Sequence, residues 1–436
     1  MSNSKDEGMT RVDILIVGAG PAGCAAAIHA HSAGFSVQIV DQANFPRDKT
    51  CGDGLTTLAL QELAAIGFQP SLVTSWRKID RLQVTSPSGR LVSMNLPDDG
   101  SSYVAIAPRF EFDDVLLHLA RERGVDVREG HAVVDIVSTS DGWVVTLDDG
   151  VTMEATYLLH CGGARGLRTL KSTAYQRGTR HRDQVIASRA YLEGTGRLPD
   201  VVHLWFWDEV LPGYAWMFPV GDDSANVGVV IHTADRKPSD IVHTTELLLD
   251  SDWLLEIVGG SARRSGALRT WPIPSEMSRS PTADGVFRLG DAAGLADPMT
   301  GEGIAQALVS ARLAIASIKQ HPDRPDKAAR RYRKALAREF LADQRTSRIL
   351  LVALRKERLA RAAVRFMGLS GGLSYWFARW TFEDVPRRAV LSPWTLVRNL
   401  GPPTGADFRG GPTPDGHWDD SASATRDPES HGPVKR

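Results

Sequence analysis

The feature of this 436-residue chain that most limits its fold is a glycine-rich turn near the N-terminus. Gly18-Ala19-Gly20-Pro21-Ala22-Gly23 fits the pattern GxGxxG. The turn follows an apolar, β-branched run at residues 12–17 and precedes a run of small residues at 21–33, which is typical of a helix. A second apolar run at 36–40 predicts another strand. This order predicts a βαβ unit in an α/β protein with a Rossmann-like domain.

The spacing of the glycines suits a bound pyrophosphate. Gly18 permits the sharp turn, Gly20 lets the backbone approach the phosphates, and Gly23 lets helix and strand pack closely. Ala22 lies in the first turn of the expected helix, where free N–H groups and the helix dipole attract negative charge. Asp41 ends the second strand, eighteen residues after Gly23, and its carboxylate is placed to bind an adenosine ribose. A glycine turn in an α/β protein without a nucleotide is the alternative.

A second glycine-containing motif occurs late in the chain. Gly290-Asp291-Ala292-Ala293-Gly294 follows an apolar run, and a helix is expected from about residue 301. Together with the first turn, this motif resembles the FAD-binding fold of the p-hydroxybenzoate-hydroxylase type. The resemblance implies that Asp291 binds the ribityl chain of FAD and that Gly301, Gly303 and Ile304 lie against the pyrimidine edge of the flavin. A helix N-terminus at that edge would stabilise the negative charge of the reduced ring.

Three further motifs narrow the resemblance. They are Cys51-Gly52-Asp53-Gly54, the segment 214–219 (YAWMFP) and the segment 298–304 (PMTGEGI). Over roughly residues 12–380 the chain resembles the geranylgeranyl reductase family of FAD-dependent oxidoreductases, whose CG(D/G)G and YxWxFP patterns are both intact here. The resemblance implies bound FAD, a large apolar cavity, and reduction of a C=C bond in the polyprenyl chain of a quinone, lipid or pigment.

Within these motifs, Cys51, Tyr214 and Trp216 are the candidate catalytic residues. An isolated alkene accepts hydride poorly, so protonation with carbocation character is expected, and aromatic faces at Tyr214 and Trp216 would stabilise that positive charge. Cys51 is expected beside the flavin as an acid or a contact, although a buried Cys also serves as a small apolar residue. Gly52 is expected to let the backbone pass close to the flavin.

For one arginine and for the clustered aromatic residues, the sequence predicts two alternative roles each. Arg109 resembles an arginine that contacts FAD in related folds, and a surface arginine is the alternative. Clustered aromatic side chains are expected either to line an apolar slot for the prenyl chain or to pack in a core. These are Trp205, Phe206, Trp207, Tyr214, Trp216 and Phe218.

One departure from the fold's usual pattern concerns the electron donor. Many relatives carry an Ala-Asp-Gly triplet that helps to bind dinucleotide phosphates, whereas this chain has Cys161-Gly162-Gly163-Ala164-Arg165. Gly162 stands where the acid is expected, which puts tight use of NADPH in doubt. The donor is left open between NADPH, ferredoxin and another reduced carrier, including an electron-donor protein.

The pattern of runs and turns predicts five segments. Residues 10–180 and 276–324 are expected to form the two parts of the FAD-binding domain, interleaved with a β-rich substrate domain at 181–275. A basic helical region follows at 325–400. Residues 401–436 are rich in Pro, Gly, Asp and Ser and are predicted to be disordered, because they cannot bury enough apolar surface to offset their ordering entropy.

Charge and cysteine content bear on location and partners. The net charge is −1, and the three cysteines form no CxxC pair, so a cytoplasmic location is expected, without a metal site. Residues 321–400 carry 18 Lys and Arg against 7 Asp and Glu. This region predicts either peripheral contact with an anionic membrane or a solvated helix packed on the core. No nucleic-acid motif accompanies the charge, so nucleic acid is not an expected partner.

Two other functions remain open on the same fold. A flavin-dependent monooxygenase or halogenase of a specialised pathway is the main alternative. Halogenases carry WxWxIP where this chain has Tyr214 and Phe218 in place of the first Trp and the Ile, which argues against halogenation. A flavoprotein that carries or senses lipid without turnover is the third reading.

Overall fold

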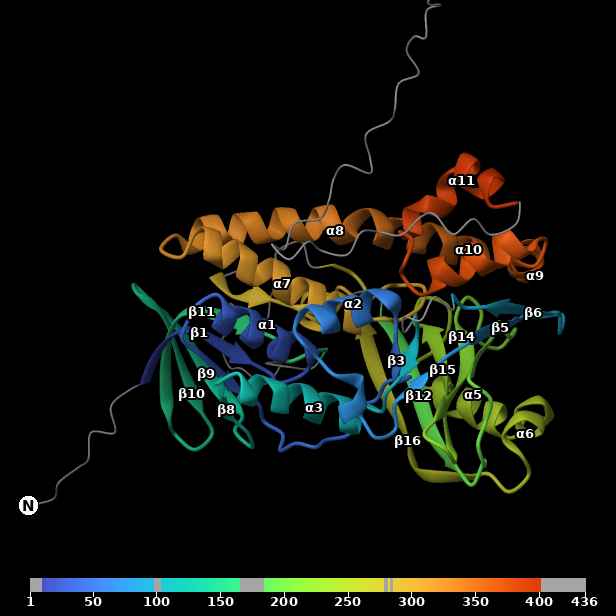
Figure 1. Cartoon of the computed structure of the whole chain (residues 1–436), viewed down its shortest axis with the longest axis horizontal. Coiled ribbons are helices and arrows are strands. Elements are labelled where there is room, and N and C mark those ends of the chain that lie inside the picture. Colours follow the sequence, from blue (N-terminus) through green and yellow to red (C-terminus); the bar gives the residue numbers. More distant parts are fainter. Residues whose placement is uncertain (1–9, 98–102, 165–183, 278–280, 283–284, 401–436) are drawn as a thin grey trace, which may run out of the picture. The chain divides into compact units, whose positions relative to one another are not determined.

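The computed structural model describes residues 10–97, 103–164, 184–277, 281–282 and 285–400. Two expectations lie outside these residues: the disorder predicted for 401–436, and any role of Arg165. Figure 1 shows the described chain, with two large sheets and helices against each.

The first sheet contains the βαβ unit predicted from the glycine-rich turn. Its order is β8-β2-β1-β11-β10-β9, with β17 paired to β11. β1 runs parallel to β2 and β11, and β17 runs parallel to β11, whereas β10 is antiparallel to both of its neighbours. The strands are β1 (Thr10–Val17), β2 (Val37–Val40), β8 (Asp126–Arg128), β9 (Val133–Thr139), β10 (Gly142–Leu147), β11 (Thr152–His160) and β17 (Phe287–Arg288).

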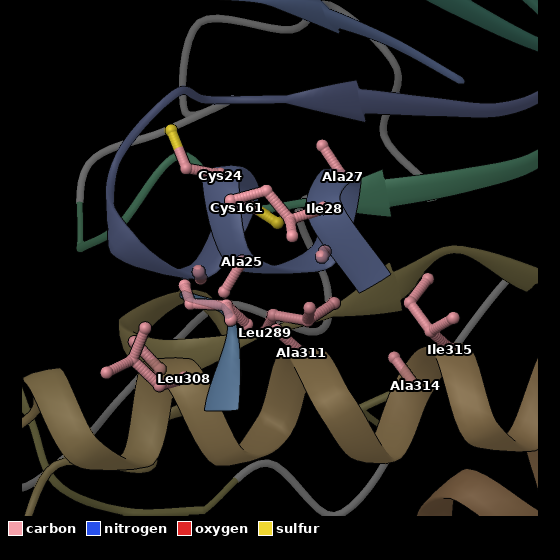
Figure 2. Packing of buried hydrophobic residues seen from close by; sticks show 14 of the residues in the cluster. Cys24, Ala25, Ala27, Ile28, Cys161, Leu289, Leu308, Ala311, Ala314 and Ile315 are labelled. Carbon is pink, nitrogen blue, oxygen red and sulfur yellow. The ribbon is translucent and has the colours of Figure 1, made fainter. Parts of the chain in front are cut away.

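Helices α1 (Pro21–Ser32) and α7 (Ile304–Gln320) pack against each other beside this sheet (Figure 1). Small side chains make that packing close. Figure 2 shows Ala25 and Ile28 of α1 facing Leu308, Ala311 and Ile315 of α7, all within one buried cluster. The helix after the second motif therefore lies beside the helix after the first, which carries the two distant turns to the same edge of the sheet.

Helix α3 (Arg109–Glu122) starts earlier than its apolar spacing indicates. The sequence predicts a helix over 112–123, because Leu116, Leu119 and Ala120 share one face. The helix begins at Arg109 because Pro108 occupies the N-cap, and it ends where Gly124 takes a φ of +88°. The extra first turn brings Arg109 into the buried part of the protein.

The second sheet contains strands from two separate stretches of the chain, residues 81–95 and 184–274. Its order is β16-β12-β15-β14-β13-β5-β6. Strands β5 and β6 come from residues 81–95, so this sheet extends beyond the segment 181–275 that the sequence indicated, and β5 pairs in parallel with β13. Its strands are β5 (Arg81–Thr85), β6 (Leu91–Asn95), β12 (Gln184–Glu193), β13 (Val201–Trp205), β14 (Tyr214–Val220), β15 (Ser224–His232) and β16 (Arg263–Pro274).

A short three-stranded sheet is formed within residues 54–106, where β5 and β6 of the second sheet lie between two of its strands in sequence. Its order is β3-β7-β4, with β3 in the CGDG motif. The elements of this region are β3 (Gly54–Leu55), α2 (Thr57–Ala65), η1 (Pro70–Leu72), β4 (Arg77–Lys78) and β7 (Ala105–Ile106). Helices α5 (Asp240–Leu249) and α6 (Asp252–Val258) contribute to an apolar cluster with the second sheet.

The C-terminal helices cover the second sheet with another apolar cluster. Helix α8 (Pro325–Leu354) packs on α7 through a buried stripe at helical spacing that includes Tyr332, Leu336 and Phe340. α10 and α9 contact β6. The remaining elements are η3 (Gly290–Ala293), α9 (Glu357–Met367), α10 (Gly371–Thr381), η4 (Arg387–Leu391) and α11 (Pro393–Arg398). Over the described ranges, no helix combines the length and the apolar character needed to cross a membrane.

Candidate active site

The first glycine turn leaves no room for side chains at two of its positions. Gly18 has a φ of +107°, and a Cβ atom there would lie 2.6 Å from the backbone carbonyl carbon of Cys161. A Cβ atom at Gly23 would lie 1.8 Å from the carbonyl oxygen of Gly18. Both contacts involve backbone that cannot move aside, so the turn depends on glycine at these positions.

Asp41 is tied to this turn at the end of β2. Its Oδ2 accepts a hydrogen bond from the Ala19 amide at 2.6 Å, and its Oδ1 accepts one from the Ala43 amide at 2.8 Å. The carboxylate is thereby held beside the turn, in the position from which the sequence predicts ribose binding.

The second motif meets the first. A Cβ atom at Gly290 would lie 3.7 Å from Cβ of Ala22 and 3.1 Å from Cβ of Ala307. Asp291 follows in η3, and its Oδ1 lies 3.1 Å from where a Cβ atom of Gly303 would be. Gly303 is the N-cap of α7, without a side-chain cap, and Ile304 is the first residue of that helix. The structure thus gathers both predicted halves of one dinucleotide site.

Arg47 provides a test of whether this site suits a phosphate. Its Nη2 lies 3.6 Å from the position of a Cβ atom at Gly20, where α1 begins without a side-chain cap. Nη2 also pairs with Asp113 at 3.1 Å, while Nη1 is buried and has no hydrogen-bond partner among the described residues. A buried, unsatisfied guanidinium nitrogen beside an uncapped helix N-terminus fits an anionic ligand such as the pyrophosphate of FAD.

Arg109 is buried rather than on the surface. Its Nε and Nη2 donate to the two carboxylate oxygens of Asp113 at 2.7 and 2.6 Å. Burial lowers the pKa of Arg109, but the Asp113 carboxylate raises it by more, so the guanidinium stays charged. The surface alternative is therefore excluded, and a direct contact between Arg109 and FAD stays a prediction.

Cys51 and Gly52 pack against the YxWxFP strand, β14. The Asn226 side-chain amide donates to the carbonyl oxygen of Cys51 at 2.8 Å, and Trp216 Nε1 donates to Asn226 Oδ1 at 3.0 Å. A Cβ atom at Gly52 would lie 3.1 Å from Cε2 of Phe218. Two motifs recognised separately in the sequence are thus joined through Asn226, and Cys51 is half-buried beside them.

Asp53 holds this junction together, although the sequence analysis did not place it among the site residues. It is fully buried with a φ of +66°. Its Oδ2 accepts from the Tyr191 hydroxyl at 2.5 Å and the Asn226 amide at 2.7 Å, and its Oδ1 accepts from the Arg109 backbone amide at 3.2 Å. Burial raises the pKa of Asp53 to about 6. Three hydrogen-bond donors from three elements therefore meet on one carboxyl group.

Lys49 is a second site residue that the sequence analysis missed. Its Nζ lies 4.1 Å from the ring centroid of Trp271 on β16. Burial lowers the pKa of Lys49 to about 8, and the charge of Arg109 adds to that shift. The run RDKTCGDG (47–54) offered the signal, since Arg47, Lys49 and Asp53 flank Cys51 in it.

An apolar cavity of about 350 Å³ lies between the second sheet and the C-terminal helices. Tyr214 reaches its wall, and the Tyr214 hydroxyl donates to the carbonyl oxygen of Thr300 in the PMTGEGI segment. Side chains from the second sheet, the PMTGEGI segment and the C-terminal helices line the cavity. They include Leu204, Phe206, Tyr214, Phe218, Met299, Thr300, Glu302, Leu350, Leu359, Ala363, Val364, Phe377, Trp380 and Leu396. The predominantly apolar wall of this cavity suits a hydrocarbon chain.

Only part of the predicted aromatic group faces this cavity. Phe206, Tyr214 and Phe218 line it. Trp205 and Trp207 do not, because they point to the opposite side, where their rings lie 4.4 and 6.3 Å from that of Trp253. β13 ends at Trp205, and beyond it Phe206 faces the cavity while Trp207 lies against Trp253. Trp216 is buried against Asn226 and is not among the described residues of the cavity wall.

Comparison with known families gives the class of protein. A family model described as an FAD-binding domain matches residues 11–317. The fold, the two joined turns and this match define an FAD-dependent oxidoreductase. Menaquinone reductase of Mycolicibacterium smegmatis is 36% identical over 324 residues, which cover 70% of this chain and 76% of that protein. The chain belongs to the geranylgeranyl reductase family of FAD-dependent oxidoreductases.

One further reductase, one reductase-like protein and one halogenase are also similar to this chain. Digeranylgeranylglycerophospholipid reductase 1 of Methanothermobacter thermautotrophicus is 27% identical, over 77% of this chain and 84% of that protein. A geranylgeranyl bacteriochlorophyll reductase-like protein from Thermoplasma acidophilum has the same fold, with a TM-score of 0.73 at 20% identity over 90% of this chain and 96% of that one. The flavin-dependent halogenase CmlS is similar at a TM-score of 0.62 and 25% identity, over 78% of this chain and 65% of that one.

The placement of Asp291 predicts the effect of removing its carboxylate. We expect Asp291→Ala to lose most of its FAD, because a hydrogen bond to a charged group contributes ~1.5–3 kcal/mol, equivalent to at least about tenfold in affinity. The ratio of flavin to protein absorbance after purification measures this loss. Asp323→Ala, at an exposed aspartate, is the matched control. Full flavin content in Asp291→Ala would show that the ribityl site lies elsewhere.

The raised pKa of Asp53 predicts a pH-dependent stability. An unfolded Asp titrates near 3.8 and folded Asp53 near 6, so between these values the folded protein holds a proton that the unfolded chain has released. The stability contributed by that proton is present below ~pH 4 and is lost as pH rises through the folded pKa. The free energy of unfolding of the wild type, minus that of Asp53→Asn, should therefore fall by roughly 3 kcal/mol across this range.

Denaturant unfolding at a series of pH values measures that difference. Asp323→Asn serves as a control that leaves the buried carboxyl in place. A difference between wild type and Asp53→Asn that does not change with pH would contradict the assignment of a raised pKa to Asp53.

Proposed function

We propose that this FAD-dependent reductase saturates a C=C bond in the polyprenyl chain of a menaquinone-like quinone. The observation that carries the proposal is the apolar cavity, whose wall includes both the YxWxFP strand and the PMTGEGI loop at the start of α7. A prenyl tail fills such a slot by burying apolar surface. The menaquinone reductase relative supports a quinone over a lipid or pigment.

Reduced FAD, when bound, supplies hydride to the C=C bond. The residues of the chain bind and orient the cofactor, stabilise developing charge and exclude water. The turns at Gly18–Gly23 and Gly290–Gly294, with Asp41, Arg47 and Asp291, bind and orient the cofactor. Tyr214 faces the cavity and presents an aromatic surface to positive charge that develops on the chain. Trp216 acts through Asn226, which positions Cys51. The cavity wall excludes water from the bond.

We further propose that the physiological reductant is a carrier other than a tightly bound NADPH. Gly162 provides no carboxylate where many relatives have an aspartate. A loosely bound nicotinamide, ferredoxin or another reduced carrier is consistent with that change. Stopped-flow measurement of FAD reduction by each donor distinguishes them.

Anaerobic turnover tests the proposed reaction. Flavin in the purified protein is reduced without oxygen, a menaquinone in detergent is added, and the product is analysed by mass spectrometry. We expect flavin reoxidation and a product heavier by two hydrogen atoms. Reoxidation that requires oxygen, with a product heavier by oxygen or halogen, would establish the monooxygenase or halogenase alternative.

A cavity-filling variant makes this test specific. Ala363 on α9 lines the cavity, whereas Ala362 on the same helix is exposed. We expect Ala363→Trp to raise KM for a long prenyl chain by tenfold or more, since each displaced CH2 group forfeits ~0.8 kcal/mol of burial. Ala362→Trp should leave KM unchanged. Equal KM values for both variants would place the substrate elsewhere.

We also propose that the C-terminal helices contact an anionic membrane from one side. Leu359 both lines the cavity and is 46% exposed, so the cavity reaches the surface at α9. Exposed apolar side chains surround the region: Ile349, Val352, Leu369, Leu391, Trp394, Val397 and Leu400. Basic side chains on the same helices are exposed as well, including Arg355, Lys356, Arg358, Arg361 and Arg398. Apolar and basic groups together favour an anionic lipid surface.

Flotation on liposomes tests this contact. Trp394 is 75% exposed, and we expect Trp394→Ser with Val397→Ser to weaken binding to phosphatidylglycerol vesicles by about tenfold or more, from the apolar area that is no longer buried. Leu72→Ser, at an exposed apolar residue of η1, is the control. Binding that does not depend on anionic lipid, or that survives the double substitution, would remove the membrane proposal.

A further inference from the structure

The reaction proposed above needs a proton as well as a hydride, and the cavity wall restricts where that proton comes from. Two titratable side chains, Tyr214 and Glu302, occur among the described residues of the wall. The Tyr214 hydroxyl already donates to the carbonyl oxygen of Thr300, and burial raises the pKa of Tyr214 further above its ordinary value. Tyr214 is therefore a weak acid in this position. Glu302 remains as the candidate proton donor among the described residues of the wall.

Glu302 belongs to a buried group of three carboxyls that share one guanidinium. Arg387 Nη2 lies 3.4 Å from Glu302 Oε2 and 4.0 Å from Glu383 Oε1, and Arg387 Nε lies 3.4 Å from Asp297 Oδ2. The side chain of Arg387 is 4% exposed and that of Glu302 is 26% exposed, on the side of the cavity. Three ionised carboxylates beside one buried cation would leave an uncompensated charge, so the group retains a proton.

Hydrogen bonding indicates which carboxyl keeps that proton. Asp297 accepts from the backbone amides of Met299 and Thr300 at 2.8 and 2.9 Å and from the Ser347 hydroxyl at 2.8 Å. These three donors satisfy both oxygens of the Asp297 carboxyl group.

Glu383 also has donors, although burial raises its pKa above the ordinary value. It accepts from the Thr56 hydroxyl at 2.9 Å and from the Gln306 amide. Among the described residues, the Glu302 carboxyl group accepts only the 3.4 Å contacts of Thr300 Oγ1 and Arg387 Nη2. Burial raises the pKa of Glu302 well above its ordinary value, and the charge of Glu383 raises it further. Glu302 is therefore the protonated member, and it is the one on the cavity wall.

We propose that Glu302 is the acid that protonates the prenyl double bond. The proposal rests on the proposed function. The π electrons of the alkene form a C–H bond with the carboxyl proton of Glu302, and the neighbouring carbon accepts the hydride that reduced FAD supplies. The alkene is reduced and the flavin is oxidised. The Glu302 carboxylate then takes up a proton from water, and Arg387 stabilises the carboxylate in the interval.

Single-turnover measurements on the prereduced holoenzyme test this role. We expect Glu302→Gln to slow alkene reduction by at least about 100-fold, the usual contribution of a general acid, with unchanged flavin content. Glu209→Gln, at an exposed glutamate, should keep the wild-type rate. Glu383→Gln removes the neighbouring charge, so the pKa of Glu302 should fall and the loss of rate at high pH should begin at a lower pH. A wild-type rate in Glu302→Gln would overturn the proposal.

Infrared spectroscopy gives a readout that does not need turnover. The C=O stretch of a protonated carboxyl should be present in the oxidised wild-type protein at neutral pH, retained in Glu209→Gln and absent in Glu302→Gln. Retention of that band in Glu302→Gln would overturn the assignment of the proton, whatever the substrate. If the wild type reduces no prenylated quinone while the band behaves as expected, the proposed function fails and the protonated state of Glu302 stands.

Discussion

One buried carboxyl group, that of Asp53, connects the parts of this protein on which the site depends. Its hydrogen bonds reach β12 through Tyr191, β15 through Asn226 and the start of α3 through Arg109. Because Asp53 is fully buried, loss of one donor would leave a costly unsatisfied group. The CGDG segment is thereby held between the second sheet and the start of α3. Cys51 lies beside this junction, where its carbonyl oxygen accepts from the Asn226 amide.

Among the described residues, the cavity combines an apolar wall with one carboxyl group, that of Glu302. The second sheet supplies Phe206, Tyr214 and Phe218, and the C-terminal helices close the other side. Glu302 lies where that wall meets the start of α7, next in sequence to Gly303, whose Cβ position is 3.1 Å from Asp291 Oδ1. The proposed hydrocarbon substrate and the proposed proton donor therefore share one cavity. Such an arrangement suits reduction of an unactivated double bond better than hydroxylation of a polar ring.

Local sequence patterns predicted the individual helices and strands well. They predicted the pairing of strands that are distant in sequence less well. The turn after β1, helix α1 and the GD motif of η3 depend on glycine and apolar spacing within a few residues, so the sequence indicates them directly. Strands β5 and β6 join the second sheet through pairing with β13, which no local pattern encodes. The aromatic run at 205–207 left two alternatives open in the sequence, because only the paired sheet shows which face is covered by α5 and α6 and which by α9 and α10.

The sequence by itself determined the family, the cofactor and the glycine pattern of the turns, because a phosphate-binding turn imposes glycine at positions where any side chain would collide with backbone. Only the tertiary structure decided that Asp53 and Arg47 belong to the site and that Glu302 faces the cavity. Their roles arise from burial and from partners such as Asn226, Asp113 and Arg387, which lie far away in sequence. A carboxyl group becomes a proton donor through its surroundings, and the fold creates those surroundings.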